Sequence, residues 1–279
     1  MGFSCISIDI LGQQLDVRQD KITAFLNNWH KSMSAEHLLA KMLNPLTRPV
    51  LDRIPVDSVA KLLDLGCGQG HTTRMLAEQF PNASATGFEY DAALVAQASA
   101  DPSNPPRIAF QQGDASRLPF PSASFDPVFT RYLLCHVPDP PTVIREMFRV
   151  TRPGGFVVAY EPDGCIEFCY PPNAAMERMS YLWRHLFPHP LIGRQLVHLF
   201  RSTGAAIYSA GAVLGMDHDQ GIYQRWYRMT AEAVRPAAIS KKLMTPKEFD
   251  DLLASARELE ADPQSVCFKL PDVWVIAKL

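Results

Sequence analysis

Short apolar runs alternate with amphipathic segments through the middle of the chain. Helices are expected from the turn after the first run to Phe80, from Asp91 onward with Asp91 as N-cap, and from Thr142 to Val150. Alternation of strand and helix predicts an α/β fold with a doubly wound parallel sheet. The predicted strands are Lys61–Leu65, Ser84–Glu89, Arg107–Gln112, Phe125–Tyr132 and Gly155–Tyr160.

The two ends of the chain have other patterns. Residues 1–17 show no clear period, whereas apolar residues from Lys21 to Leu51 recur at three- and four-residue spacing, which is typical of two or three amphipathic helices. After Tyr160 the pattern becomes helical and aromatic as far as residue 200. The remaining predicted elements are a strand at Ala205–Met216, a helix at Gln220–Arg235, a helix from a capping box at Thr245 to about Leu259, and strands at Val266–Phe268 and Val273–Leu279.

One residue conflicts with its predicted strand. Pro127 lies inside Phe125–Tyr132 and cannot donate a hydrogen bond to a neighbouring strand. We therefore expect Pro127 at the beginning of that strand.

The composition disfavours a nucleic-acid-binding protein and a membrane-spanning protein. The chain has 279 residues, 47% hydrophobic and 20% charged, with a formal net charge of −2, which disfavours a binder of nucleic-acid phosphates. The longest apolar runs are of strand length, so no membrane span is expected. The six cysteines are scattered and no secretory leader is evident, so we expect a cytoplasmic protein with reduced thiols.

A glycine-rich turn follows the first strand, with the sequence Asp64-Leu65-Gly66-Cys67-Gly68-Gln69-Gly70. Glycines at a strand-to-helix turn allow tight turning and close approach of the backbone to a ligand. A dinucleotide-binding loop needs a third glycine where this chain has His71 or Thr73, depending on the register. A Walker A loop is excluded because no Gly-Lys-Ser/Thr follows.

Acidic residues recur at the ends of the first three predicted strands. Glu89 ends the second, where its carboxylate can accept both hydroxyls of a ribose. Asp114 follows the third and is placed to accept the amino group of an adenine. Any one acid alone fits a loop-end cap equally well, but Asp64, Glu89 and Asp114 in this order favour a binding site.

From about Lys61 to Asp163 the chain resembles the class I S-adenosylmethionine-dependent methyltransferases. The resemblance is to the group that includes the ubiquinone- and menaquinone-type C-methyltransferases and many small-molecule methyltransferases. Besides the glycine loop, the matching motifs are Gly113-Asp114-Ala115, Leu118-Pro119-Phe120, Ser124-Phe125-Asp126 and Arg152-Pro153-Gly154-Gly155.

This resemblance implies a cofactor and the residues that bind it. S-adenosyl-L-methionine would lie with its methionine part against the glycine loop, its ribose at Glu89 and its adenine at Asp114. The predicted cofactor-binding residues are Asp64, Gly66, Cys67, Gly68, Gly70, Glu89, Tyr90, Asp114, Ala115 and Arg131.

The resemblance also implies a Rossmann-like, mostly parallel sheet with a reversed C-terminal strand, which a hairpin-like C-terminal end could supply. We expect residues 1–55 to form an N-terminal helical cap or lid, and residues 56–279 to form the methyltransferase domain. Helical additions at about 161–200 and 219–260 would complete a cap over the substrate. Aromatic and methionine residues in these additions either line an apolar pocket or pack the helices on the sheet.

Candidate catalytic residues follow the fourth and fifth strands. His136 is a candidate general base, or a structural histidine bonded to backbone. Glu161 and Asp163 either contact substrate or cap the next segment. Trp29 and His30 either form part of a lid or pack in the core.

Other chemistries find less support. Asn104-Pro105-Pro106 and Asp139-Pro140-Pro141 lack the following aromatic residue of amino-group methylases that act on nucleic acids. The spacings Cys165–Cys169 and His185–His189 suit a metal or arsenic ligand pair, but without neighbouring ligands we predict no metal.

The sequence therefore predicts an enzyme that methylates a small, partly apolar metabolite. The alternative is a cofactor-binding protein of the same fold that has lost methyl transfer and serves a regulatory or other role. Methylation of protein or RNA is a third option that the near-neutral composition does not favour, and the acceptor atom and oligomeric state stay open.

Overall fold

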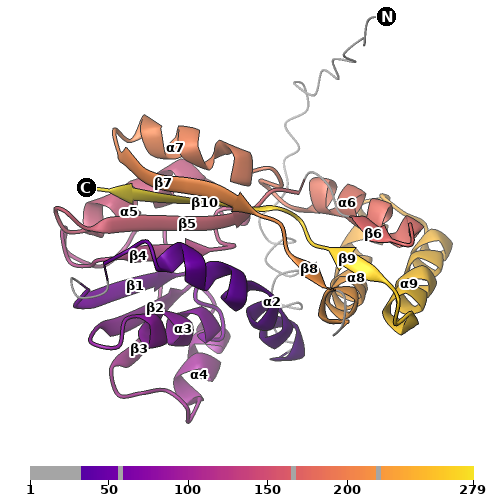
Figure 1. Cartoon of the computed structure of the whole chain (residues 1–279), viewed down its shortest axis with the longest axis horizontal. Helices are drawn as coiled ribbons and strands as arrows, with labels where there is room; N and C mark the ends of the chain where they lie inside the picture. The colour runs from indigo at the N-terminus through magenta and orange to yellow at the C-terminus, as the bar shows by residue number, and fades with distance from the viewer. Residues whose placement is uncertain (1–32, 56–58, 165–167, 218–220) are drawn as a thin grey trace, which may run out of the picture.

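The structure is a computed structural model that describes residues 33–55, 59–164, 168–217 and 221–279. Figure 1 shows a large sheet with helices on both faces and, beside it, a smaller part that we call the helical cap. The cap consists of β6 (Phe168–Tyr170), α6 (Ala174–Leu186), β8 (Met216–Asp217), α8 (Ile222–Ser240), α9 (Pro246–Ala261) and β9 (Val266–Phe268).

The large sheet has the strand order β3-β2-β1-β4-β5-β10-β7, and neighbouring strands are parallel except that β10 runs antiparallel to both β5 and β7. This confirms the predicted doubly wound sheet with a reversed C-terminal strand. The strands are β1 (Lys61–Leu65), β2 (Ser84–Glu89), β3 (Ile108–Gln112), β4 (Val128–Arg131), β5 (Phe156–Pro162), β7 (Ala206–Val213) and β10 (Asp272–Lys278).

Helices cover both faces of this sheet, which is why its central strands are apolar on both sides. Leu63 of β1 packs in one core cluster with Val143 of α5, while the adjacent Leu62 packs in the opposite cluster with Leu76 of α3. The flanking helices are α3 (His71–Gln79), α4 (Ala92–Ala100), α5 (Pro140–Val150) and α7 (Leu196–Ser202), the last preceded by the short helix η2 (Gly193–Gln195).

Local sequence signals account for several element boundaries. The side chain of Asp91 accepts from the backbone N–H of Ala93 and caps α4, as predicted. Thr245 and Glu248 form the predicted capping box at the start of α9. β4 begins at Val128, so Pro127 precedes the strand, and its carbonyl accepts from Leu63 N at 3.0 Å.

The expected C-terminal hairpin is wrong. β9 pairs with β6 and β8 in the small sheet of the cap, whereas β10 pairs with β5 and β7 in the large sheet. Asp272 of β10 stands opposite Val213 of β7, so the reversed strand pairs with a segment from which most of the cap separates it along the chain. Side-chain patterns of individual strands carry no information about such a distant partner.

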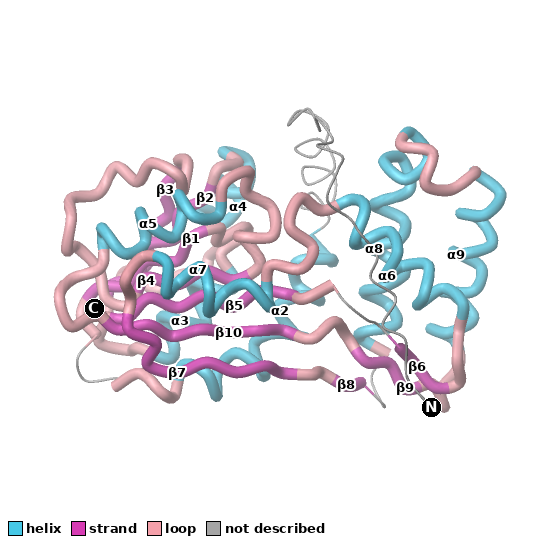
Figure 2. The backbone as a smooth tube through the Cα atoms, turned by 90° about the horizontal axis from the view of Figure 1, so that it is seen from above, coloured by secondary structure: helices cyan, strands magenta, loops and turns pink. Residues whose placement is uncertain are grey.

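The predicted addition at 161–200 divides between the two parts of the molecule. β6 and α6 belong to the cap, but Leu196 and Phe200 of α7 pack in the core on the sheet with α5. Inside the cap, α6, α8 and α9 share their own apolar core, which includes Met179, Val234 and Leu252. Figure 2 shows α6 and α8 lying side by side beyond the ends of β5 and β10.

α2 (Met33–Leu51) joins the two parts (Figures 1 and 2). Leu38 and Met42 of α2 pack with Trp226 and Tyr227 of α8, and Val50 packs under the sheet. The helices expected before residue 33, with Trp29 and His30, lie outside the described residues. Within the described ranges, none of the helices has the length and apolar character that crossing a membrane requires.

Candidate cofactor and acceptor site

The glycine loop forms the predicted turn between β1 and α3. Gly66, Gly68 and Gly70 have φ values of 72°, 53° and 82°, in the left-handed region that favours glycine. A Cβ atom on Gly70 would stand 2.6 Å from the ring of Phe110. The loop therefore has little room for side chains at these three positions, and its backbone packs closely against the neighbouring elements.

Glu89, at the end of β2, lies against this loop. Its Oε2 accepts from Gly68 N at 3.0 Å, and its Oε1 accepts from Tyr90 N at 2.8 Å and Asp91 N at 3.1 Å. The structure thus brings the glycine loop and the second predicted acid together. Tyr90 itself is 65% exposed.

Asp114 and Ala115 follow the neighbouring strand β3. The backbone N–H of Gly113 donates to Glu89 O at 2.9 Å, which holds this segment beside the end of β2. Asp114 is exposed, and its Oδ1 accepts from Ser116 N at 2.8 Å. The three acids predicted from the sequence therefore lie at the carboxyl ends of three adjacent strands, which is where open α/β sheets bind ligands.

A further carboxylate, which the sequence reasoning missed, comes from α2. Glu36 Oε2 accepts from Gln69 N in the loop at 2.8 Å, and a Cβ atom on Gly68 would stand 3.0 Å from both Glu36 carboxylate oxygens. Glu36 is only 8% exposed. No local pattern marks this residue, because its partner is 33 positions away in the chain.

Three carboxylates, those of Asp64, Glu89 and Glu36, lie close to the loop. Burial raises the pKa of Asp64 to about 7, against the opposing effects of the hydrogen bond from Thr73 Oγ1 (2.6 Å) and the charge of Arg131. Burial, together with the charges of Asp64, Glu89 and Glu36, raises the pKa of the Cys67 thiol well above its ordinary value. Such surroundings suit a ligand that carries positive charge, as a sulfonium with an α-ammonium group does.

Arg131, at the end of β4, holds α2 over the site. Its Nη1 donates to Asn44 Oδ1 at 3.0 Å and Thr47 Oγ1 at 3.1 Å on α2, and its Nη2 donates to Thr72 Oγ1 at 2.8 Å on α3. Burial lowers the pKa of the Arg131 guanidinium. These contacts give Arg131 a positioning role, while direct contact with the cofactor stays a prediction.

Glu161, near the end of β5, clamps the segment that follows β4. Its Oε1 accepts from Leu133 N and Leu134 N, both at 2.9 Å, and its Oε2 accepts from Cys135 N at 3.2 Å. Burial raises the pKa of Glu161 to about 7, although the three backbone donors favour the charged form. The carboxylate thus positions the backbone just before His136, and its catalytic role stays a prediction.

His136 and Asp163 lie at the same edge of the sheet. The ring of His136 is half-buried, with its centroid 5.1 Å from that of Phe187 in the turn after α6. Asp163 is buried and accepts from Arg194 N, inside η2, at 2.8 Å, and it forms an ion pair with the Arg194 guanidinium at 2.7 Å. Both Asp163 oxygens thus bind a residue 31 positions away in the chain, and a contact of Asp163 with substrate stays a prediction.

Behind this edge lies a buried polar network that the sequence did not indicate. Asp272 accepts from the hydroxyls of Tyr132 at 2.6 Å and Tyr160 at 2.8 Å, and forms an ion pair with Lys269 at 2.6 Å. Lys269 is 2% exposed and Asp272 is fully buried. The network connects the segment between β9 and β10 to the end of β4, and so joins the cap to the sheet.

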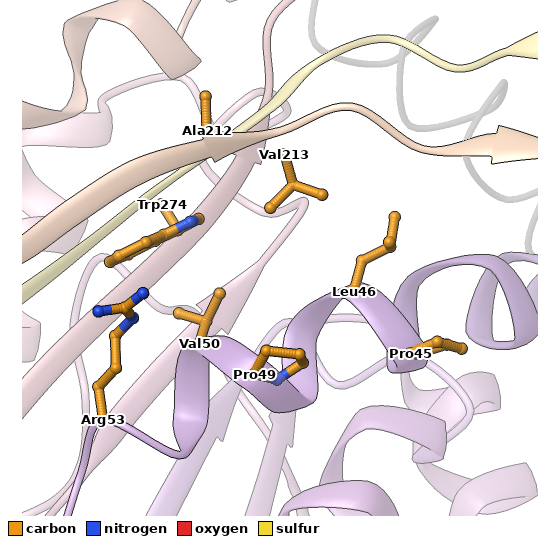
Figure 3. Close-up of a pocket in the computed structure, with 8 residues that line it drawn as sticks. All are labelled: Pro45, Leu46, Pro49, Val50, Arg53, Ala212, Val213 and Trp274. Carbon is orange, nitrogen blue, oxygen red and sulfur yellow. The ribbon is translucent and has the colours of Figure 1, made fainter.

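A surface groove of about 250 Å³ lies elsewhere, between α2 and the strands β7 and β10 (Figure 3). Its lining includes Leu46, Val50 and Trp274, with the Arg53 guanidinium 5.0 Å from the centre of the Trp274 ring. The groove contains none of the candidate residues. Cys165, one of the residues weighed as a metal ligand, lies outside the described ranges, and within those ranges no three His, Cys, Asp or Glu side chains gather closely enough to hold a metal ion.

The chain is similar to known methyltransferases in sequence. Residues 63–159 match a family model described as a methyltransferase domain. The demethylmenaquinone methyltransferase of Geobacillus stearothermophilus is 31% identical over 173 residues, which cover 61% of this chain and 71% of that protein. The trans-aconitate 2-methyltransferase of Deinococcus radiodurans is 37% identical over 109 residues, which cover 39% of this chain and 40% of that protein.

Solved structures share the fold at low sequence identity. A Haloferax volcanii protein in complex with the Trm112 methyltransferase activator is 16% identical with a TM-score of 0.58, covering 90% of this chain and 95% of that chain. The [4+2]-cyclase SpnF is 22% identical with a TM-score of 0.53, covering 84% of this chain and 80% of that chain. At these identities the likeness concerns the fold alone.

The sheet order, the glycine loop and the acids at the strand ends define a methyltransferase of class I. With the family match and the Geobacillus relative, the chain belongs to the class I S-adenosylmethionine-dependent methyltransferases, whose cofactor is S-adenosyl-L-methionine. The chain spans 40%, 44% and 46% of three trans-aconitate 2-methyltransferases that it matches, less than half of each.

Proposed function

We propose that this protein transfers a methyl group from S-adenosyl-L-methionine to a small, partly apolar metabolite. The observation that carries the proposal is the contact between Gly68 N and Glu89 Oε2 at 3.0 Å, which joins the glycine loop to the acid at the end of β2 in a class I fold. Relatives named for quinone-type and trans-aconitate acceptors support a small-molecule substrate.

In this proposal the loop backbone from Gly66 to Gly70 takes the methionine part of the cofactor, together with Asp64 and Cys67. Glu89, beside Tyr90, accepts from the ribose, and Asp114 with Ala115 lies against the adenine. Arg131 completes the cofactor site by holding α2 against α3.

When bound, the cofactor supplies a methyl group that its sulfonium already makes electrophilic. The protein's own residues then have to orient the acceptor and exclude water from the site. In this proposal residues 1–55, which include α2, and the helical additions at about 161–200 and 219–260 form the cover over the acceptor. His136 takes the proton from the acceptor on its imidazole if the acceptor carries one, with Glu161 positioning the preceding backbone.

We further propose a cytoplasmic protein that does not act on nucleic acid. The near-neutral composition supports the second point. For the first, the described cysteines Cys67, Cys135, Cys169 and Cys267 form no disulfide with one another, as suits a reducing compartment.

Methyl-labelled S-adenosylmethionine tests the proposal. The purified protein is incubated with it and a panel of quinols, phenols, carboxylic acids and amines, and we expect label in at least one acceptor together with S-adenosylhomocysteine. If calorimetry shows cofactor binding but no acceptor in the panel or in a metabolite extract takes label, the protein is a cofactor-binding protein without methyl transfer. Absence of cofactor binding would refute the site itself.

A further inference from the structure

Aromatic side chains run from the candidate catalytic edge into the cap. The ring of His136 lies 5.1 Å from that of Phe187, which lies 4.0 Å from that of Trp183 on α6. Trp183 in turn stacks on Trp226 of α8, with centroids 5.7 Å apart and planes inclined by 12°. These four side chains form a continuous aromatic chain that ends between α6 and α8.

Polar atoms at the far end of this chain are buried without hydrogen-bond partners. Among the described residues, nothing accepts from the indole Nε1 of Trp183 or of Trp226, and Thr230 Oγ1 also has no partner. Trp226 is 3% exposed and Thr230 is 1% exposed. Buried polar groups in native proteins normally have hydrogen-bond partners. Three buried polar atoms without partners in one small region therefore indicate that a bound ligand supplies the partners.

The three side chains are placed to act together. Trp226 and Thr230 are one helical turn apart and so share a face of α8, and Trp183 stacks on Trp226. A fourth buried atom of this kind, Gln224 Oε1, belongs to a side chain whose Nε2 bonds to Ser265, at roughly 200° around the helix from Trp226. Gln224 therefore takes no part in the group.

This region meets the candidate site. Trp226 and Trp183 pack in one core with Leu38 and Met42 of α2 and with Tyr132, which directly follows β4. α2 also carries Glu36 to the glycine loop. The unpaired donors thus lie where the cap, α2 and the carboxyl edge of the sheet come together.

We propose that Trp183, Trp226 and Thr230, where α6 meets α8, form the acceptor subsite, and that this subsite binds a flat, conjugated or aromatic compound carrying at least one oxygen acceptor. This inference rests on the proposed function and specifies its substrate class. Indole faces pack against a planar ring, while indole N–H groups can only donate and so require an acceptor such as a carbonyl oxygen.

A polycarboxylate fits this region less well. Such a ligand needs several cationic partners, whereas Lys269, whose ammonium lies 5.8 Å from the centre of the Tyr132 ring, is already paired with Asp272 at 2.6 Å. The apolar neighbours Met176 and Met179 on α6 also favour a flat apolar body over a charged chain.

Binding of two flat bicyclic probes tests the subsite, in the presence of S-adenosylhomocysteine. Coumarin carries a carbonyl oxygen, whereas naphthalene has nearly the same shape without an acceptor. We expect the wild-type protein to bind coumarin about tenfold more tightly than naphthalene by equilibrium dialysis. Trp226→Phe and Thr230→Val should each reduce this preference severalfold, and Thr230→Val, which removes only a hydroxyl, should leave naphthalene binding unchanged.

Trp274→Phe is the matched control, since Trp274 is a buried indole in the large sheet and should not affect either probe. Near-ultraviolet circular dichroism checks that each variant is folded, and Thr230→Val removes a single hydroxyl should the tryptophan variant fail to fold. An unchanged coumarin preference in folded variants, or no binding of either probe to the wild type, overturns the subsite.

The experiments can refute the acceptor subsite and the proposed methyl transfer independently of each other. If labelled methyl transfer succeeds while the variants keep the coumarin preference, only the subsite is wrong. If no acceptor takes label while coumarin binding depends on Trp226 and Thr230, the subsite stands and methyl transfer is refuted.

Discussion

Glu36 of α2 and Gln69 of the glycine loop are joined by a 2.8 Å hydrogen bond from the loop N–H to the Glu36 carboxylate. This contact places the carboxylate of an α2 residue beside the loop that we propose as part of the cofactor site.

Replacement of Glu36 tests the electrostatic part of that contact. Glu36→Gln should weaken binding of S-adenosylmethionine by about tenfold, since a unit charge at roughly 10 Å and an effective dielectric near 20 contributes about 1–2 kcal/mol. S-adenosylhomocysteine lacks the sulfonium charge and should lose less, as titration calorimetry with both ligands would reveal. Glu78→Gln is the control, because Glu78 also contacts α2, through Arg48, but on the exposed surface. Equal losses for both ligands would contradict the charge argument.

The glycine loop allows a test with a matched backbone control. Gly68→Ala introduces a Cβ in a left-handed conformation, which costs about 1–2 kcal/mol, and sets it 3.0 Å from the Glu36 oxygens. Gly204→Ala has the same backbone penalty (φ of 84°) but no atom within 4 Å of the added carbon. We expect Gly68→Ala to bind the cofactor at least about tenfold more weakly than the wild-type protein, and Gly204→Ala to bind it as tightly as the wild type. Equal cofactor affinities of the two variants would argue against the loop as the cofactor site.

His136→Phe separates base catalysis from packing, since it keeps a ring beside Phe187 and removes the proton acceptor. If His136 is the base, the methylation rate should fall by roughly 10²–10⁴ with cofactor affinity unchanged, and the pH–rate profile should lose its acidic limb. An active variant with an unchanged profile would show that the acceptor needs no base, as for a thiolate, a carbanion or a free amine.

Glu161 predicts a pH-dependent contribution to stability. Its pKa rises on folding from about 4.5 to about 7, so between these pH values the folded protein holds the proton more tightly than the unfolded chain does. The free energy of unfolding therefore falls as the pH rises through this window, by about 3 kcal/mol for this group. Glu161→Gln does not titrate, so chemical denaturation should give a larger destabilisation by the variant at pH 5 than at pH 8. The reverse order would contradict the assigned pKa.

The buried Lys269–Asp272 pair predicts a large effect on stability. Lys269→Met leaves Asp272 buried without its cation and should cost about 3–5 kcal/mol in urea denaturation. Lys247→Met breaks the exposed pair with Asp251 at 3.0 Å and should cost less than about 1 kcal/mol. If both variants lost similar amounts of unfolding free energy, burial of the Lys269–Asp272 pair would not contribute to stability.

The features that could be predicted correctly from the sequence involve residues close together in the chain. Asp91 and Thr245 cap helices with residues two or three positions away, and the glycine loop joins two consecutive elements. Short-range hydrogen bonds and side-chain periodicity determine such features, so they can be predicted from a window of the chain.

What the sequence did not reveal depends on tertiary contacts. Tyr132 and Asp272 are 140 positions apart, and Glu36 meets the loop only because α2 packs against α3. Likewise, the pattern of β10 indicates a buried strand but not that β7 is its neighbour. The unpaired indole of Trp226 resembles any other core tryptophan in sequence, since its pairing depends on every residue that surrounds it.

The register between Val213 and Asp272 has an evolutionary consequence. Because these residues face each other on adjacent antiparallel strands, a tight turn could join β7 directly to β10, and everything between them, including α8 and α9, is an insertion at one point of the sheet. Lineages can lengthen, shorten or exchange this insert while the strands that carry Asp64 and Glu89 stay in register. Under the proposed function, a change in this insert would alter the acceptor subsite while the strand ends that carry the candidate cofactor residues keep their places.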